Sequence, residues 1–398
     1  MRSVLTLAKN NYKQVLFGVI SLILLAIISY SGISTITNNK LSQPEINAIN
    51  SSLSSQIILD NPLFAPFKIP VYFLIKTGLA TITSLRMVSA TYGIILAIFF
   101  YLFIKRWFSS KIAWLATAML STSGLFLNYS RLAVPYILLP FSLLLLLWSS
   151  WWIYQSKNIK AKLIVALCLV IACFYIPGLI WFAVILVLLQ KPHFKNMFAG
   201  ISITYTYISV LLVLFLIMPL IVAFYKDSTV LMQWLALPSQ FDIKNLTNNF
   251  LLIPISFVIR SESNPVFNLG RLPYLDIITI CLAVLGTYAF AIRFKLMRTK
   301  ALVFSILIAL LLLSFENQVQ VNILLPVIYT VVASGIMFLL QQWLSVFPKN
   351  PIARVVGIAL IACTLSLSIY YNTVRYFLAW GNNPISQQAF QIKLPEKF

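Results

Sequence analysis

The sequence has very few residues that could carry acid–base or metal chemistry. Only 9% of its 398 residues are charged, eight of them are Asp or Glu, and His193 is the single histidine. One histidine nearly excludes a Ser-His-Asp triad or a zinc site. The four cysteines lie inside apolar runs without a Cys-x-x-Cys pair, which indicates packing residues. Function, if chemical, must depend on a small set of side chains.

Apolar residues are what the chain has instead. They make up 61% of it, and apolar runs recur from residue 15 to residue 371 with no soluble-like block of domain size between them. This composition lies far outside that of a soluble globular domain. It predicts a polytopic membrane protein in which residues 1–398 form one transmembrane domain. The first run is too long for a cleaved signal peptide and is expected to be a retained helix.

Charge predicts the topology, because loops rich in Lys and Arg face the cytoplasm. The basic connections hold 17 of the 29 Lys and Arg residues, whereas all eight acids fall on the other side. The sequence therefore predicts a cytoplasmic N-terminus, an extracytoplasmic C-terminus and any chemistry on the outer face. The basic residues form no nucleic-acid module and suit anionic membrane lipids instead. About eleven spanning helices are expected, over 15–34, 86–104, 112–128, 134–154, 163–175, 178–190, 199–225, 276–292, 301–314, 321–340 and 355–372.

Whether residues 163–190 form two spans or one decides on which side of the membrane every later loop lies. Residues 163–190 are split at Tyr-Ile-Pro-Gly, 175–178, into a short hairpin. A single Pro-kinked helix would instead send the later basic loops outward. Charge placement favours the hairpin.

Two long outer loops, over about 35–85 and 226–275, and a short outer tail, 373–398, complete the predicted fold. Residues 68–83 are apolar but interrupted by Lys76, which predicts a helix lying on the outer membrane surface. The second loop mixes apolar runs with charges and predicts an interfacial cap. The predicted fold class is thus an all-α polytopic membrane protein with amphipathic helices in its outer loops.

The order of these features resembles the GT-C superfamily of polyprenyl-phosphate-sugar-dependent glycosyltransferases, which includes protein mannosyltransferases and aminoarabinose transferases. The resemblance is carried by NPLFAPFKIPVYFLIKTG, 61–78, by 84–136, which closes on SRLAVPY, and more loosely by 321–336. It implies a GT-C-like fold and transfer of a sugar from a polyprenyl-phosphate donor to a glycan, lipid or protein acceptor on the outer face. Family members usually carry Asp, often Asp-Glu, after the first helix. Here only Glu45 is available, and Tyr136 stands where a second acid often follows.

Such a transfer needs a carboxylate that deprotonates the acceptor hydroxyl and cations that stabilise the departing phosphate. Glu45 is the candidate base, although Ser-Gln-Pro-Glu, 42–45, also fits an ordinary helix start. Asp60 is a second candidate, with a turn-forming role as its alternative. No metal ligand set is evident, and a divalent metal is possible but unsupported.

Arg131 is the leading candidate for phosphate binding, because it lies between two long apolar runs with no acid near it in sequence. Its guanidinium could bind phosphate in a bidentate manner beside Tyr136, or could simply snorkel at the membrane edge. Its partner is expected to be a distant acid, Glu45 above all, or an anionic ligand. Arg86, Arg260 and Arg271 are further outer-face cations that could contact substrate, and their alternative role is that of solvated residues at the membrane edge.

Two other functions remain open. A catalytically silent membrane subunit or lipid-glycan binding protein could use the same scaffold. A transporter or flippase is less favoured, because it would normally need polar groups near the midplane and these helices have few.

Overall fold

The computed structural model describes residues 12–154, 173–191, 203–238, 241–316 and 318–394. Of these described residues, 76% are helical. Its one described sheet is a two-stranded antiparallel pair of β1 (Leu41–Ser42) and β2 (Phe390–Ile392). The predicted all-α class is confirmed.

Six described helices are long and apolar enough to cross a membrane. They are built on α2 (Tyr12–Tyr30), α6 (Ile82–Trp107), α13 (Ile203–Lys226), α17 (Met297–Ser314), α18 (Leu325–Val346) and α19 (Pro351–Val374). Shorter apolar helices include α9 (Leu138–Tyr154), α11 (Leu179–Leu189) and α16 (Ile277–Ala291). The chain is therefore a multi-pass helical membrane protein.

The predicted span over 112–128 is two helices, α7 (Ser110–Thr122) and α8 (Gly124–Ser130). Ser123 between them is extended, and its Oγ accepts from the backbone N of Phe126, which caps α8. The apolar pattern alone does not reveal this break, because a serine cap inside a run hardly lowers its hydropathy. The predicted span over 163–175 lies outside the described residues as far as residue 172, so the full count of eleven stays a prediction.

Close backbone contact holds α16 against α18. A Cβ on Gly286 would lie 1.9 Å from the carbonyl oxygen of Val331, and one on Gly335 would lie 2.0 Å from that of Leu282. Only glycine permits this approach. Most of α18 is buried, whereas α2, α13 and α19 expose apolar side chains, as lipid-facing helices do.

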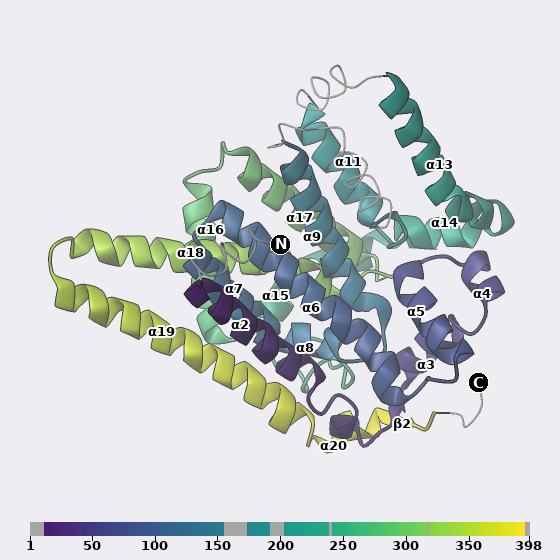
Figure 1. Cartoon of the computed structure of the whole chain (residues 1–398), viewed down its shortest axis with the longest axis horizontal. Coiled ribbons are helices and arrows are strands. Elements are labelled where there is room, and N and C mark those ends of the chain that lie inside the picture. Colours follow the sequence, from purple (N-terminus) through teal and green to yellow (C-terminus); the bar gives the residue numbers. More distant parts are fainter. Residues whose placement is uncertain (1–11, 155–172, 192–202, 239–240, 317, 395–398) are drawn as a thin grey trace.

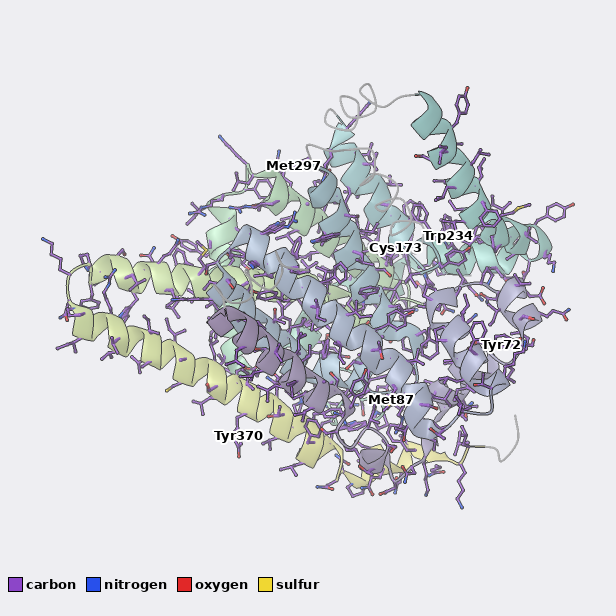
Figure 2. All side chains as sticks on the ribbon, viewed as in Figure 1. Tyr72, Met87, Cys173, Trp234, Met297 and Tyr370 are labelled. Atoms are coloured by element: carbon purple, nitrogen blue, oxygen red, sulfur yellow. The ribbon has the colours of Figure 1, made fainter. Side chains whose placement is uncertain are left out.

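The loops predicted to lie outside gather at one end of the molecule. Figure 1 shows α3 (Gln43–Asn50), α4 (Ser55–Asp60), α5 (Ala65–Lys76), α14 (Ser228–Leu235) and β2 on one side, opposite the turn between α18 and α19. Figure 2 shows Met87, near the start of α6, far from Met297 at the start of α17. The two predicted sets of loops are thus separated along one axis, which we call the outer and inner ends.

The predicted turn at 175–178 is confirmed. Gly178 has φ +75°, its N donates to the carbonyl of Trp234, and the backbone N of Phe64 donates to the carbonyl of Tyr175. Trp234 Nε1 in turn donates to the carbonyl of Phe174, and Figure 2 shows Cys173 and Trp234 side by side. The turn therefore packs against both outer loops, as an outer hairpin turn should.

The predicted surface helix over 68–83 has different bounds. Helix α5 runs from Ala65 to Lys76, and the chain turns at Gly78, with φ +69°, before α6 begins. Thr81 and Ser84 belong to the capping box of α6, which is why the predicted helix ended too late. The second outer loop forms α14, α15 (Ile243–Val258) and an irregular segment, 259–276.

Candidate functional site

Glu45 forms an ion pair with Arg86 rather than with Arg131. Arg86 Nε lies 2.7 Å from Glu45 Oε1 and Arg86 Nη2 lies 3.0 Å from Oε2, and both side chains are fully buried. The remaining guanidinium protons go to Thr37 Oγ1 and to the carbonyls of Ile33 and Lys40. The predicted pairing of Glu45 with Arg131 is therefore wrong.

The Glu45 carboxylate is saturated with donors. Besides the two from Arg86, it accepts from Ser42 N, Ser42 Oγ and Ala133 N, each at 2.9 Å. Ser42 is the N-cap of α3, so Glu45 occupies the third position of a capping box. A carboxylate with five donors and no exposed surface is poorly placed to receive a proton from an acceptor hydroxyl. The geometry favours the helix-start interpretation of this residue.

Arg131 bonds to backbone carbonyls. Its Nη1 donates to the carbonyl of Ile28 and its Nη2 to that of Ser31, at the end of α2. Its Cζ lies 5.2 Å from the ring centre of Tyr376 and 4.8 Å from that of Phe377. Stacked rings and carbonyl acceptors account for its two Nη groups. Arg131 Nε, however, is buried and has no hydrogen-bond partner among the described residues. The expectation of an acidic partner is therefore wrong for the acids that the structure describes, because none of them pairs with Arg131. An anionic ligand at Arg131 stays a prediction.

Asp60 and Tyr136 take no part in the Glu45–Arg86 ion pair. Asp60 forms an exposed ion pair of 2.9 Å with Lys226. Tyr136 belongs to a ring cluster in which Tyr129 stacks on Phe267, 4.5 Å between ring centres and almost parallel. This cluster anchors the irregular segment 259–276 to the body.

Arg260 and Arg271 are brought together by that segment. The backbone N of Ser261 donates to the carbonyl of Arg271 at 3.3 Å, so the stretches of backbone that carry the two arginines lie next to each other. Both line a half-open cavity of about 450 Å³ between α15, the segment itself, the end of α17 and η3 (Val321–Leu324). Four arginines and one tyrosine were predicted to bind substrate, and of these five only Arg260 and Arg271 line a described cavity at the outer end.

Two carboxylates that the sequence did not single out line the same cavity. They are Glu262, beside Arg260, and Glu316, just after α17. Glu316 has φ +50°, a strained conformation for a residue with a side chain, and its Oε1 accepts from Asn249 Nδ2 at 2.8 Å. Within the described chain none of these four charged groups is in an ion pair. They therefore remain available to a ligand.

The C-terminal segment holds the irregular segment 259–276, which forms part of the cavity wall, through hydrogen bonds. Arg375 donates to Asn268 Oδ1 and to the carbonyl of Pro273, both at 2.8 Å, and Trp380 Nε1 donates to the carbonyl of Pro265 at 3.0 Å. Arg375 and Trp380 lie on η4 (Arg375–Trp380), a π-helical end to α19. Arg375 is one of many basic residues in the sequence, and no local signal predicts its role.

Asp276 is a second buried acid that local sequence could have revealed. It is the N-cap of α16, accepting from Thr279, and it also accepts from Ser368 and Asn372 of α19, each at 2.9 Å. The Asp-x-x-Thr spacing fits a cap. Its role is to join α16 to α19.

Lys68 is a buried cation on α5. Its Nζ donates to the carbonyl of Asn61 at 2.7 Å, and burial lowers the pKa of its ammonium to about 8. The side chain is only 6% exposed. Helix α5 was predicted, but which of its faces packs inward was not.

No family model matches the sequence, and no curated protein matches it. The structure is similar to the crystal structure of ArnT from Cupriavidus metallidurans in the apo state. The TM-score is 0.57 at 10% sequence identity, over 95% of this chain and 78% of that chain. A likeness at this identity is one of fold, so the chain has an ArnT-like fold.

Proposed function

We propose that the chain is a GT-C-type membrane glycosyltransferase that moves a sugar from a polyprenyl-phosphate donor to an acceptor on the extracytoplasmic face. The observation that carries the proposal is the outer cavity, in which two arginines and two carboxylates lie unpaired on a GT-C-like scaffold. Its position at the predicted outer end matches the side on which lipid-linked donors of this kind are expected. No metal is invoked, because the groups that line the cavity already offer both charges.

Arg260 and Arg271 are proposed to bind the donor phosphate, since guanidinium groups recognise phosphate through paired hydrogen bonds. An acceptor hydroxyl oxygen attacks the anomeric carbon, the bond from that carbon to the phosphate oxygen breaks, and the bonding pair leaves with the phosphate. The arginines stabilise the charge that develops there.

Glu316 is proposed as the base that takes the hydroxyl proton. It lies just after α17 and lines the same cavity as the two arginines, and Asn249 orients its carboxylate. Glu262 is the alternative base, although it lies two residues from Arg260 and is better placed to pair with it. Glu45 becomes a positioning residue that holds the outer loop, and Asp60 has no role in the reaction.

Polyprenyl phosphate binding tests the donor half of the proposal. Undecaprenyl phosphate in mixed micelles should bind the purified parent protein, with binding read by native mass spectrometry. The double variant Arg260→Gln/Arg271→Gln should bind it at least tenfold more weakly, because two charge-assisted contacts are lost. A matched double variant at the inner end, Lys349→Gln/Arg354→Gln, should bind as the parent does. Equal binding by all three proteins would move the donor site elsewhere.

The buried state of Glu45 supports a second function, the catalytically silent scaffold. Its carboxylate, the one acid at the place where the family carries its acids, is unavailable as a base. Release of free undecaprenyl phosphate from undecaprenyl-phosphate sugars separates the two. The enzyme predicts release that Glu316→Gln reduces by roughly 10²-fold or more. Tight binding without release by the parent would favour the scaffold.

A further inference from the structure

A second cavity, of about 250 Å³, lies at the inner end of the molecule. It is formed where the end of α16 and the turn to α17 meet α18 over residues 334–342 and the residue that follows α6. Its polar and aromatic lining includes Arg293, Arg298, Gln341, Gln342, Phe108 and Phe338. It shares no residue with the outer cavity.

The charge of this inner cavity is uncompensated. Within the described chain neither guanidinium forms a hydrogen bond or an ion pair, and Arg298 Cζ lies 6.0 Å from the centre of the Trp107 ring. The segments that meet here supply no acid, since the sequence has none over 61–226, 277–315 or 317–395. Two like charges without an acid make a cavity that favours an anion.

The surroundings of the cavity are apolar and open. Ile292 and Phe294, on the turn that carries Arg293, are more than half exposed, and so is Tyr288 on the last turns of α16. In a membrane these side chains face acyl chains at the level where headgroups begin. A ligand here would therefore place an anionic group among the arginines and apolar chains beside α16.

We propose that the inner cavity binds the phosphate of an anionic phospholipid headgroup. The two guanidinium groups bind phosphate oxygens, the Gln341 and Gln342 amides donate to the rest of the headgroup, and the acyl chains lie along Ile292 and Phe294. The site takes a structural or regulatory lipid of the leaflet on the basic side, and it is independent of the sugar transfer proposed above.

Lipid retention tests this assignment. The full-length protein is delipidated in detergent, incubated with mixed micelles of phosphatidylglycerol or phosphatidylcholine, and examined by native mass spectrometry. The parent should retain phosphatidylglycerol over phosphatidylcholine. Arg293→Gln/Arg298→Gln should bind phosphatidylglycerol roughly 25-fold more weakly, at about fivefold per removed charge. The matched control, Lys349→Gln/Arg354→Gln, removes two charges from the same end without touching the cavity and should retain the lipid.

Each other outcome overturns the proposal. Equal retention by the cavity variant and the parent would exclude the cavity. An equal loss in the control would show diffuse attraction by the whole basic end. Displacement of phosphatidylglycerol by excess inorganic phosphate would assign the cavity to a free anion instead of a lipid. Melting curves of all three proteins check folding, because Arg293 is exposed and its loss should leave the fold intact.

Discussion

The side chains of Glu45 and Arg86, 41 residues apart, form a two-bonded ion pair that solvent does not reach. The pair joins the first outer loop to the start of α6, and through Ala133 N it also holds the chain just after α8. A buried pair of this kind contributes little net stability when intact, but breaking it leaves an uncompensated charge. The first role of Glu45 is therefore to stabilise the fold, and any loss of activity in a Glu45 variant has to be separated from a loss of stability.

Glu45→Gln should destabilise the protein by about 3 to 5 kcal/mol, because the Arg86 guanidinium would remain buried without its counter-charge. A thermal melt followed by tryptophan fluorescence measures this. The matched control is Asp60→Asn, which breaks an ion pair whose two side chains are more than half exposed and should change the free energy of unfolding by less than about 1 kcal/mol. A normal melt for Glu45→Gln together with lost sugar transfer would restore Glu45 as the base.

Arg131→Lys should lower the melting temperature as well. A lysine ammonium cannot donate to the carbonyls of Ile28 and Ser31 in the same fork, nor stack on Tyr376 and Phe377 as a planar guanidinium does. The effect should be local, so hydrogen exchange in α2 and η4 should quicken more than exchange in α18. Unchanged exchange combined with weaker undecaprenyl phosphate binding would instead place Arg131 in the donor site.

Sequence reasoning predicted the architecture well and the pairing of side chains poorly. The helical class, the turn at 175–178 and the separation of the outer loops all follow from hydropathy and charge, which are read along the chain. Which arginine meets Glu45 depends on how three distant segments pack, and neither periodicity nor spacing encodes that. The choice of Arg131 over Arg86 failed for this reason.

The cavity residues show the same limit. Arg260 and Arg271 were expected on the outer face, and the structure brings them together through the hydrogen bond of Ser261 to the Arg271 carbonyl. Glu316 carried no motif at all. Its distinguishing features are a positive φ and a hydrogen bond from Asn249, 67 residues away, and both arise only in the folded chain.

Gly335→Ala should separate α16 from α18, because its Cβ would overlap the carbonyl oxygen of Leu282 at 2.0 Å. Backbone cannot move aside as a side chain can, so we expect a loss of at least about 2 kcal/mol in the free energy of unfolding. Gly18→Ala in α2 is the control, since no atom lies within 4 Å of its added Cβ. It should be neutral or slightly stabilising. Similar melts for both variants would contradict the close approach.

The lowered pKa of Lys68 should make the stability of the folded protein depend on pH. Its pKa is about 8 in the folded protein against 10.5 for a solvated lysine, so the unfolded chain binds more protons between these values and stability rises with pH across that window. The destabilisation is complete below pH 8 and corresponds to about 3 kcal/mol at most. Lys68→Met should therefore raise the melting temperature at pH 7, with a gain that shrinks toward pH 10.5. Lys76→Met, which removes an exposed ammonium from the end of the same helix, is the matched control for the loss of a lysine.

The predicted orientation in the membrane decides which side of the membrane each of the two proposed sites faces. The outer cavity lies at the end that holds Glu45 and Asp276, and the inner cavity lies at the end whose connecting turns carry only basic residues. Because basic turns stay in the cytoplasm, the outer cavity should face away from it.

In a cysteine-free background, an impermeant maleimide added to intact cells should label Lys244→Cys and Asn382→Cys, but label Lys295→Cys and Lys349→Cys only after permeabilisation. All four positions are exposed, so accessibility within the fold does not confuse the result. Labelling of Lys295→Cys in intact cells would reverse the topology after the turn at 175–178, and would place the arginines of the outer cavity where lipid-linked sugars of the outer leaflet cannot reach them.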